Sequence, residues 1–239
     1  MLLGITNMPG GCGFGNRFLY YYNLRQEAHK RGWSYFSVPW NGHNLFEGNM
    51  LGSYMPGAPY QNFPFCLGEK LYDYDGISTR EVFKLKNPPQ VQNGVCAIHF
   101  RGTDFHQWNP DSILDSKYYL ESIEEVKDSA SGFILFTDDQ QLPSYQKVLA
   151  FIKDEKLSYL TGDNMADRNY YMKDFSIMSE CDYIISSPST FGIAAGLIGK
   201  HKKIIHSKKW VLDRVSREDK FWVDLHAGGN EDYSLWRLV

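Results

Sequence analysis

The chain has 239 residues, of which 43% are hydrophobic and 22% are charged, and its formal net charge is −3. This composition is typical of a globular protein with a real core, either one large domain or two small ones. The acidic balance and the absence of a long basic run argue against a nucleic-acid partner, because duplex binders carry a basic patch.

The cysteines and apolar runs favour a soluble protein of a reducing compartment. The four cysteines lie far apart and form no C-x-x-C pair, so neither a structural zinc site nor a redox motif is predicted. The apolar run at the N-terminus is too short for a signal peptide, and no stretch approaches the ~20 apolar residues of a membrane helix. We therefore expect a cytoplasmic protein without a membrane span.

The first part of the chain predicts two short strands around one helix. Met1–Thr6 and Trp33–Val38 are the expected strands, and the helix is expected from Arg17 to about Arg31. Between Asn41 and Pro64 the sequence is rich in glycine, proline and aromatic residues and shows little periodicity. Irregular segments of this length are commonly functional, and the aromatic content argues against disorder.

A glycine-rich loop, Gly10–Asn16, precedes this helix. It lacks the third glycine of the G-x-G-x-x-G dinucleotide fingerprint, since Asn16 occupies that position. Its backbone can still approach a ligand closely, and a helix N-terminus favours an anion. Asn16 either offers its amide to a ligand as a donor or caps the helix.

Two prolines in the segment Lys86–Gln90 favour an extended linker, and we place a domain boundary there, giving domains 1–88 and 89–239. In the second domain strands alternate with helices, which predicts a parallel sheet with helices on both faces. The expected strands are Val95–Phe100, Gly132–Phe136, Leu157–Leu160, Tyr183–Ser186 and Lys203–His206. The expected helices are Ser112–Lys127, with Asp111 and Ser112 as candidate caps, Ser144–Lys156, Tyr170–Cys181 and Phe191–Ile198.

Polar residues follow two neighbouring strands of this prediction, where ligands of open α/β sheets bind. Arg101 carries a permanent charge and a fork of donors suited to phosphate or carboxylate, or else it forms an ion pair with Asp104. Asp138 and Asp139 either bind ribose, a base edge or a metal, or one of them caps the next helix.

A third strand ends in hydroxyl residues. Ser189 and Thr190 begin a helix of small residues, so they either form an anion nest with the backbone or act as caps. Near the first strand, His99 fits a hydrogen-bonded core histidine. His106 lies in the loop beyond it, where it is freer to touch a substrate.

Taken together, these motifs resemble those of the fucosyltransferases that use GDP-fucose, which comprise the α-1,2-, α-1,6- and protein O-fucosyltransferase groups. The motifs occur in family order from the N-terminus to about residue 192. The matching residues are Gly13, Gly15, Asn16 and Arg17 for G-x-G-N-[QR], His99, Arg101 and Asp104 for H-x-R-x-x-D, Thr137, Asp138 and Asp139 for T-D-D, and Asp174, Met178, Ser179, Cys181, Asp182, Ser189, Thr190 and Phe191 for the last motif.

The resemblance implies a GT-B fold, with two Rossmann-like domains, the first one reduced, facing across a cleft. It also implies an inverting, metal-independent transfer of fucose from GDP-fucose, a donor substrate rather than a cofactor, to a glycan acceptor. By position, Arg101 would bind the β-phosphate, with Ser189 and Thr190 as further phosphate ligands. Asp174 would read the guanine edge, Asp138 or Asp139 would support the nucleotide, and Asn16 would reach in from the first domain.

The resemblance leaves several assignments open. His106 and Asp111 are both candidates for the base, and the segment Asn41–Phe65 is the candidate for acceptor contact. Gly102 stands where many relatives have a second arginine. One alternative is a non-catalytic module of the same fold that binds a sugar nucleotide or glycan. Another is a metal-dependent transferase that uses the D-x-D of Asp73 and Asp75, although a solvated turn fits that segment better.

Overall fold

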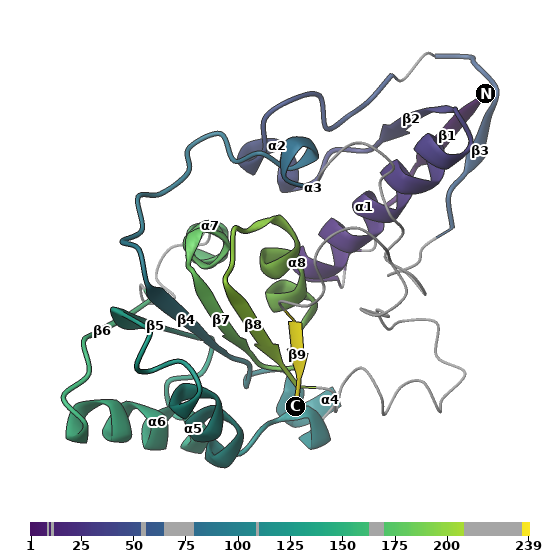
Figure 1. Ribbon diagram of the computed structural model, residues 1–239. Coiled ribbons are helices and arrows are strands. Elements are labelled where there is room, and N and C mark those ends of the chain that lie inside the picture. Colours follow the sequence, from purple (N-terminus) through teal and green to yellow (C-terminus); the bar gives the residue numbers. More distant parts are fainter. Residues whose placement is uncertain are drawn as a thin grey trace. The chain divides into compact units, whose positions relative to one another are not determined.

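The fold is taken from a computed structural model, which describes residues 1–8, 10, 12–53, 56–64, 79–108, 110–162, 170–207 and 236–239 (Figure 1). The described residues fall into two compact units, one within Met1–Asn87 and the other beginning at Pro88. Each unit is built on its own parallel sheet, which confirms the predicted α/β class.

The first unit contains a three-stranded sheet in the order β2-β1-β3. Its strands are β1 (Leu2–Ile5), β2 (Ser34–Ser37) and β3 (Tyr60–Asn62), all parallel, and α1 (Phe14–Lys30) connects the first two. Two short helices, α2 (Gly42–Leu45) and α3 (Thr79–Val82), follow β2 and β3. The sequence did not predict β3, because its three exposed residues carry no alternation and only their pairing with β1 defines the strand.

Helix α1 begins three residues earlier than the sequence predicts. Gly13 is its N-cap and makes no side-chain capping bond, so Asn16 lies in the first turn and the capping alternative for Asn16 is wrong. The extension is explained by packing, because Phe14 is buried against the ring of Trp40 at 5.9 Å between centroids. Burial of an aromatic side chain outweighs the low helix propensity of the glycine that follows it.

The second unit contains a six-stranded parallel sheet in the order β6-β5-β4-β7-β8-β9. All five predicted strands are present, with ends shifted by two residues at most, and the short β9 was not predicted. Their bounds are β4 (Val95–Phe100), β5 (Gly132–Thr137), β6 (Tyr159–Thr161), β7 (Tyr183–Ser186), β8 (Lys203–His206) and β9 (Trp236–Leu238).

Helices cover both faces of this sheet, as the alternating pattern predicts. Figure 1 shows α5 (Ser116–Glu124) and α6 (Pro143–Asp154) on one face, and α7 (Tyr170–Glu180) and α8 (Thr190–Ile198) on the other. The strands supply alternate residues to the two faces. Ile98 and Phe100 of β4, for example, belong to the core under α5 and α6.

The start of α5 corrects the predicted cap. Pro110–Ser112 forms a short 3-10 turn, and α5 begins only at Ser116. Its cap is Asp115, whose carboxylate accepts the backbone N–H groups of Lys117 and Tyr118 at 2.8 and 3.3 Å. The sequence offered several capping residues in a row, and the preceding turn selects the last of them.

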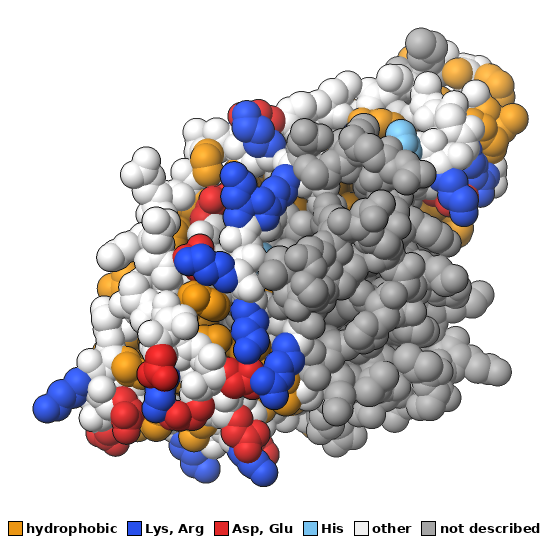
Figure 2. Space-filling view, in the orientation of Figure 1, with side chains coloured by type: hydrophobic (Ala, Val, Ile, Leu, Met, Phe, Trp, Pro, Cys, Tyr) orange, Lys and Arg blue, Asp and Glu red, His pale blue; other side chains and the backbone are white. Residues whose placement is uncertain are grey.

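Charged side chains on the outer helices form local pairs of opposite sign. In Figure 2, acidic and basic side chains lie interspersed over α5 and α6. Lys127 lies 2.7 Å from Glu124, and Lys117 lies 3.8 Å from Glu121. Within the part of the chain that the structure describes, no helix is long and apolar enough to cross a membrane.

We expect Asp115→Ala to lower the free energy of unfolding by about 1 kcal/mol, because two N–H groups of α5 lose their acceptor. Urea denaturation measures this value. Asp115→Asn should retain most of the stability, and the exposed Asp128→Ala serves as the control. An equal loss in Asp115→Ala and Asp128→Ala would contradict the capping role.

Candidate functional site

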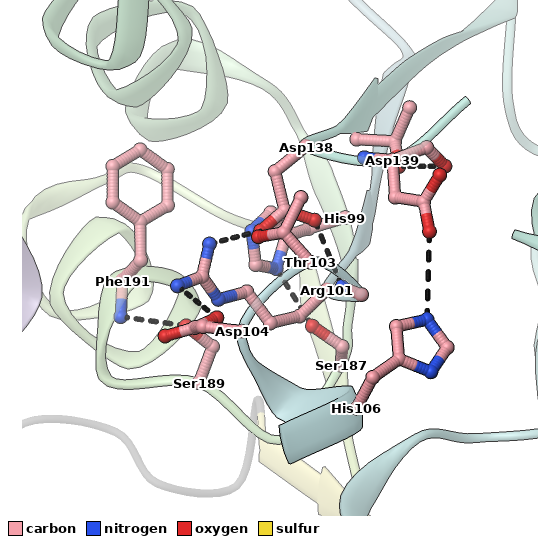
Figure 3. Close-up of polar contacts among 12 residues, drawn as sticks. His99, Arg101, Thr103, Asp104, His106, Asp138, Asp139, Ser187, Ser189 and Phe191 are labelled. Atoms are coloured by element: carbon pink, nitrogen blue, oxygen red, sulfur yellow. Dashed lines mark hydrogen bonds and ion pairs between the residues drawn. The ribbon is translucent and has the colours of Figure 1, made fainter. Parts of the chain in front are cut away.

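The polar ends of three neighbouring strands meet at one edge of the six-stranded sheet. β4 lies between β5 and β7, and its His99 is in register with Phe136 of β5 and Ser186 of β7. The loops that follow these strands therefore begin side by side, as expected for parallel strands. Figure 3 shows the side chains that they bring together.

The carboxylate of Asp138, at the end of β5, binds three donors from the loop after β4. Oδ1 accepts the backbone N–H of Gly102 at 2.8 Å, while Oδ2 accepts the hydroxyl of Thr103 at 2.8 Å and Nη1 of Arg101. Asp138 is only 8% exposed, so these bonds replace the water that the carboxylate loses. They fix the backbone and the arginine of the loop together.

The guanidinium of Arg101 lies between two carboxylates that differ in exposure (Figure 3). Nη1 contacts the buried Asp138, and Nη2 lies 2.6 Å from Asp104, whose side chain is 52% exposed. The guanidinium carbon also lies 5.4 Å from the ring centre of Phe105. The predicted ion pair with Asp104 is confirmed, and the arginine side chain remains 29% exposed.

The other aspartate, Asp139, supports the same loop from a different direction. Its Oδ1 accepts the N–H of Gln141 at 2.9 Å, and its Oδ2 lies 3.5 Å from Nε2 of His106, on the short helix α4 (Phe105–Trp108). Leu142 is the N-cap of α6, without a side-chain bond. The alternative that Asp138 or Asp139 caps the next helix is therefore wrong.

Gly102 is required by the close approach of the two loops. A Cβ at this position would lie 2.9 Å from Cβ of Asp139 and 3.3 Å from Cδ1 of Leu142. An arginine here, as in the double arginine of many relatives, would force the β5 loop to move. The departure from the family motif thus has a steric basis in this chain.

His99 is the hydrogen-bonded core histidine that the sequence suggested. Its ring is buried, and Nδ1 lies 2.9 Å from the hydroxyl of Ser187. The ring stacks on Phe191 with 5.4 Å between centroids. Burial lowers the pKa of His99 to about 4, against a smaller raising effect of Asp138, so His99 is neutral at pH 7.

Ser189 and Thr190 lie at the N-terminus of α8, on the loop after β7. The hydroxyl of Ser189 accepts the N–H of Phe191 at 3.2 Å, which confirms the capping alternative. Both residues are less than 10% exposed. The helix end still presents its positive pole at the same edge of the sheet as Arg101.

The remaining predicted residues are not part of the contacts around Arg101. Asp174 is on α7, where its Oδ1 lies 3.4 Å from a Cβ placed at Gly162, so it stands near the end of β6 at this edge of the sheet. Gly13, Gly15 and Asn16 belong to the other unit. Residues 73–75, with the D-x-D, lie outside the described residues. Among the described residues no cluster of three His, Cys, Asp or Glu side chains is placed to hold a metal ion.

Three contact residues of the site were missed in the sequence. Thr103 donates to Asp138, Ser187 contacts His99, and the ring of Phe105 lies near Arg101. Their positions just after the strands were a usable signal. Which of the many hydroxyls and rings there would turn inward depends on contacts between strands that are far apart in sequence.

We expect the free energy of unfolding to rise with pH between about 4 and 6.5, and to be level above that range. The unfolded chain binds a proton at each histidine below pH 6.5, whereas burial lowers the pKa of His99 and of His206 in the folded state to about 4. One such histidine contributes a slope of about 1.4 kcal/mol per pH unit. Urea denaturation across this range measures it.

The His99→Asn variant should reduce that slope, whatever its effect on stability at pH 7. His29→Asn removes an exposed histidine of α1 and is the matched control. A His99→Asn slope equal to that of the wild type would show that His99 is already protonated in the folded protein.

Comparison with models of protein families gives a match. The model of the family described as "Glycosyl transferase family 11" matches residues 84–224, more than half of the chain. The matched region includes the whole edge formed by the loops after β4, β5 and β7. No curated protein sequence matches the chain.

Proposed function

The chain belongs to glycosyl transferase family 11, a fucosyltransferase family, and from this membership we propose that it transfers fucose from GDP-fucose to a hydroxyl of a glycan acceptor. Membership identifies a glycosyltransferase, which favours the enzyme over the non-catalytic module. The finer proposal adds the GDP-linked donor, inversion at the sugar carbon and independence of metal. The observation that supports the donor is the guanidinium held at the carboxyl edge of the matched sheet.

Arg101 is proposed to bind the β-phosphate of the donor. The buried Asp138 holds Nη1 and orients the guanidinium, while the exposed Asp104 holds Nη2 only at the surface. Exposed ion pairs contribute little free energy, so a phosphate can replace Asp104 more readily than Asp138. In this proposal Asp104 is the temporary partner that the donor displaces.

The N-terminus of α8 is proposed to bind the diphosphate together with Arg101. Ser189 and Thr190 lie there, and the helix dipole adds positive potential. This contribution matters because the same edge carries the carboxylates of Asp104, Asp138 and Asp139, which repel an anion. The phosphates therefore need donors on the β7 side of the arginine, away from the aspartates of β5.

The chemistry follows from charge development. When the bond between fucose and phosphate breaks, negative charge grows on GDP and positive charge grows on the sugar. A guanidinium already fixed by Asp138 stabilises that charge without reorganising. The acceptor hydroxyl attacks the opposite face of the sugar carbon, which inverts it, and His106, with Asp139 beside it, is the proposed proton acceptor.

The two units are proposed to divide the substrates between them. Residues 89–239 would bind the nucleotide, with Asp174 at the guanine edge, and residues 1–88 would bind the acceptor. Asn16 and the glycines before it, Gly13 and Gly15, would extend from the first unit to the donor. The buried His99 would not contact the donor itself. It would orient Ser187 and Phe191 of the loop at the start of α8.

We expect Arg101→Lys to weaken GDP binding about 10-fold or more, because lysine keeps the charge but not the planar fork. Calorimetry with GDP measures the affinity, and UDP is the comparison ligand. Arg101→Ala should abolish donor turnover. Wild-type protein that binds GDP no better than UDP would remove the donor assignment.

The matched control is Lys202→Ala, which removes an exposed lysine that pairs with the partly buried Asp182 at the amino end of β7. It should leave GDP affinity unchanged. Thermal unfolding of each variant establishes that it is folded, since Arg101→Ala leaves a buried carboxylate without its cation. A folded Arg101→Ala with wild-type GDP affinity would exclude the phosphate role.

We expect fucose transfer from GDP-fucose to persist in EDTA, because Arg101 and the α8 terminus neutralise the leaving group. The measurement is the transfer of labelled fucose to a panel of neutral saccharides, with and without chelator. Loss of transfer that Mg²⁺ or Mn²⁺ restores would contradict the proposal and would direct attention to Asp73 and Asp75.

A further inference from the structure

Among the described residues, three buried side-chain nitrogens around one turn of the first unit have no hydrogen-bond partner. They are Nε1 of Trp40, Nε2 of His43 and Nε of Arg17. Trp40 is only 6% exposed. A buried donor or acceptor left unpaired costs free energy comparable to a lost hydrogen bond, so such groups call for a ligand or an ordered water.

These side chains come from one tight turn and the helix beside it. Trp40 follows β2, and His43 follows it by three residues on α2, with 6.5 Å between the ring centroids. Arg17 lies in the first turns of α1. Its Nη1 donates at 2.7 Å to Oδ1 of Asn41, which lies between Trp40 and His43 in the turn after β2. β2 and α1 thus bring the nitrogens to the carboxyl edge of the first sheet, where α/β proteins bind ligands.

The turn also orients the histidine ring. Nδ1 of His43 lies 2.7 Å from the carbonyl oxygen of Trp40, to which it can donate, and 3.0 Å from the backbone N–H of Trp40, from which it can accept, so the two contacts require opposite tautomers. The shorter contact favours the tautomer in which Nδ1–H donates to the carbonyl. Nε2 then carries a lone pair and accepts a hydrogen bond. The unpaired set therefore consists of two N–H donors, on Trp40 and Arg17, and one acceptor, on His43.

This mixture of donors and an acceptor identifies the chemical class of the ligand. A carboxylate or a phosphodiester can accept from Trp40 and Arg17 but has no hydrogen for Nε2 of a neutral His43. A hydroxyl both donates and accepts, so neighbouring hydroxyls of a neutral saccharide can satisfy all three nitrogens.

We infer that the Trp40–His43 turn, with Arg17, binds hydroxyl groups of the glycan acceptor. The inference rests on the proposed function for the identity of the ligand as an acceptor, whereas the unpaired nitrogens stand independently of it. Trp40 and Arg17 donate to sugar oxygens, and Nε2 of His43 accepts a sugar hydroxyl hydrogen. The site holds and orients the acceptor, and the proton transfer of the reaction takes place elsewhere.

The test uses four neutral saccharides as probes: galactose, lactose, N-acetylglucosamine and chitobiose. Each is added to the full-length ¹⁵N-labelled protein at concentrations on the order of 10 mM, suited to weak sugar binding. The indole N–H signal of Trp40, assigned by its loss in Trp40→Phe, should shift with at least one probe. If none of the four moves this signal, the inference is overturned, and a bound water is the better explanation for the nitrogens.

Two substitutions of one residue provide the matched comparison. Asparagine places its amide near the position of Nδ1, so His43→Asn keeps the turn and removes Nε2. Glutamine reaches the position of Nε2, so His43→Gln restores an acceptor there. We expect His43→Asn to weaken binding of the active probe by about 3- to 10-fold and His43→Gln to recover most of it. Equal affinity in the wild type and His43→Asn would overturn the role of His43.

GDP affinity separates this inference from the proposed function. The Trp40 and His43 variants should bind GDP like the wild type, because Arg101 and α8 belong to the other unit. GDP binding without any saccharide shift refutes the acceptor site and leaves the donor proposal intact. A saccharide shift without GDP binding supports the acceptor site and refutes the donor proposal.

Discussion

The carboxylate of Asp138 organises the matched edge of the sheet. It belongs to the loop after β5, yet all three of its donors, the N–H of Gly102, the hydroxyl of Thr103 and Nη1 of Arg101, belong to the loop after β4. Each bond contributes on the order of 1 kcal/mol net, but an unpaired buried carboxylate would cost far more. The position of the arginine and the conformation of its loop are therefore set by one group, which is a form of preorganisation that charge stabilisation requires.

Burial sets the second constraint, because it keeps the histidines behind this edge neutral. The pKa values of His99 and His206 fall to about 4, with burial as the main cause in each case. The neutral imidazoles of His99 and His206 add no positive charge, so the guanidinium of Arg101 and the α8 terminus carry the electrostatics of the proposed diphosphate site. His99 instead contributes shape, through Ser187 and the ring of Phe191.

The two units carry complementary sets of polar groups. In the second unit, a fixed cation is held between carboxylates at the carboxyl edge of its sheet, which suits an anionic leaving group. In the first unit, buried nitrogens of both donor and acceptor type lie at the corresponding edge, which suits neutral hydroxyls. A transferase that moves a sugar from a nucleotide to a glycan needs one site of each kind.

Much of the fold could be predicted from local patterns. The apolar runs and their punctuation predicted β4, β5, β7 and β8 closely, and the family motifs pointed to residues 99–104, 137–139 and 189–191. Edge strands β3 and β9 escaped prediction, because three residues acquire strand identity only through a partner. The cap of α5 and the first turn of α1 were misplaced, since packing and preceding turns decide among several competent residues.

The sequence by itself determined which residue types follow each strand, because strand ends are encoded locally by apolar runs and turn residues. Only the tertiary structure decided what those residues do. Asp138 was equally suited to cap a helix or to bind a ligand until β4 and β5 became neighbours and its oxygens found their three donors. The same holds for Trp40 and His43, whose unpaired nitrogens appear only after the turn buries them. Burial and pairing between distant segments are properties of the folded chain, and no local pattern encodes them.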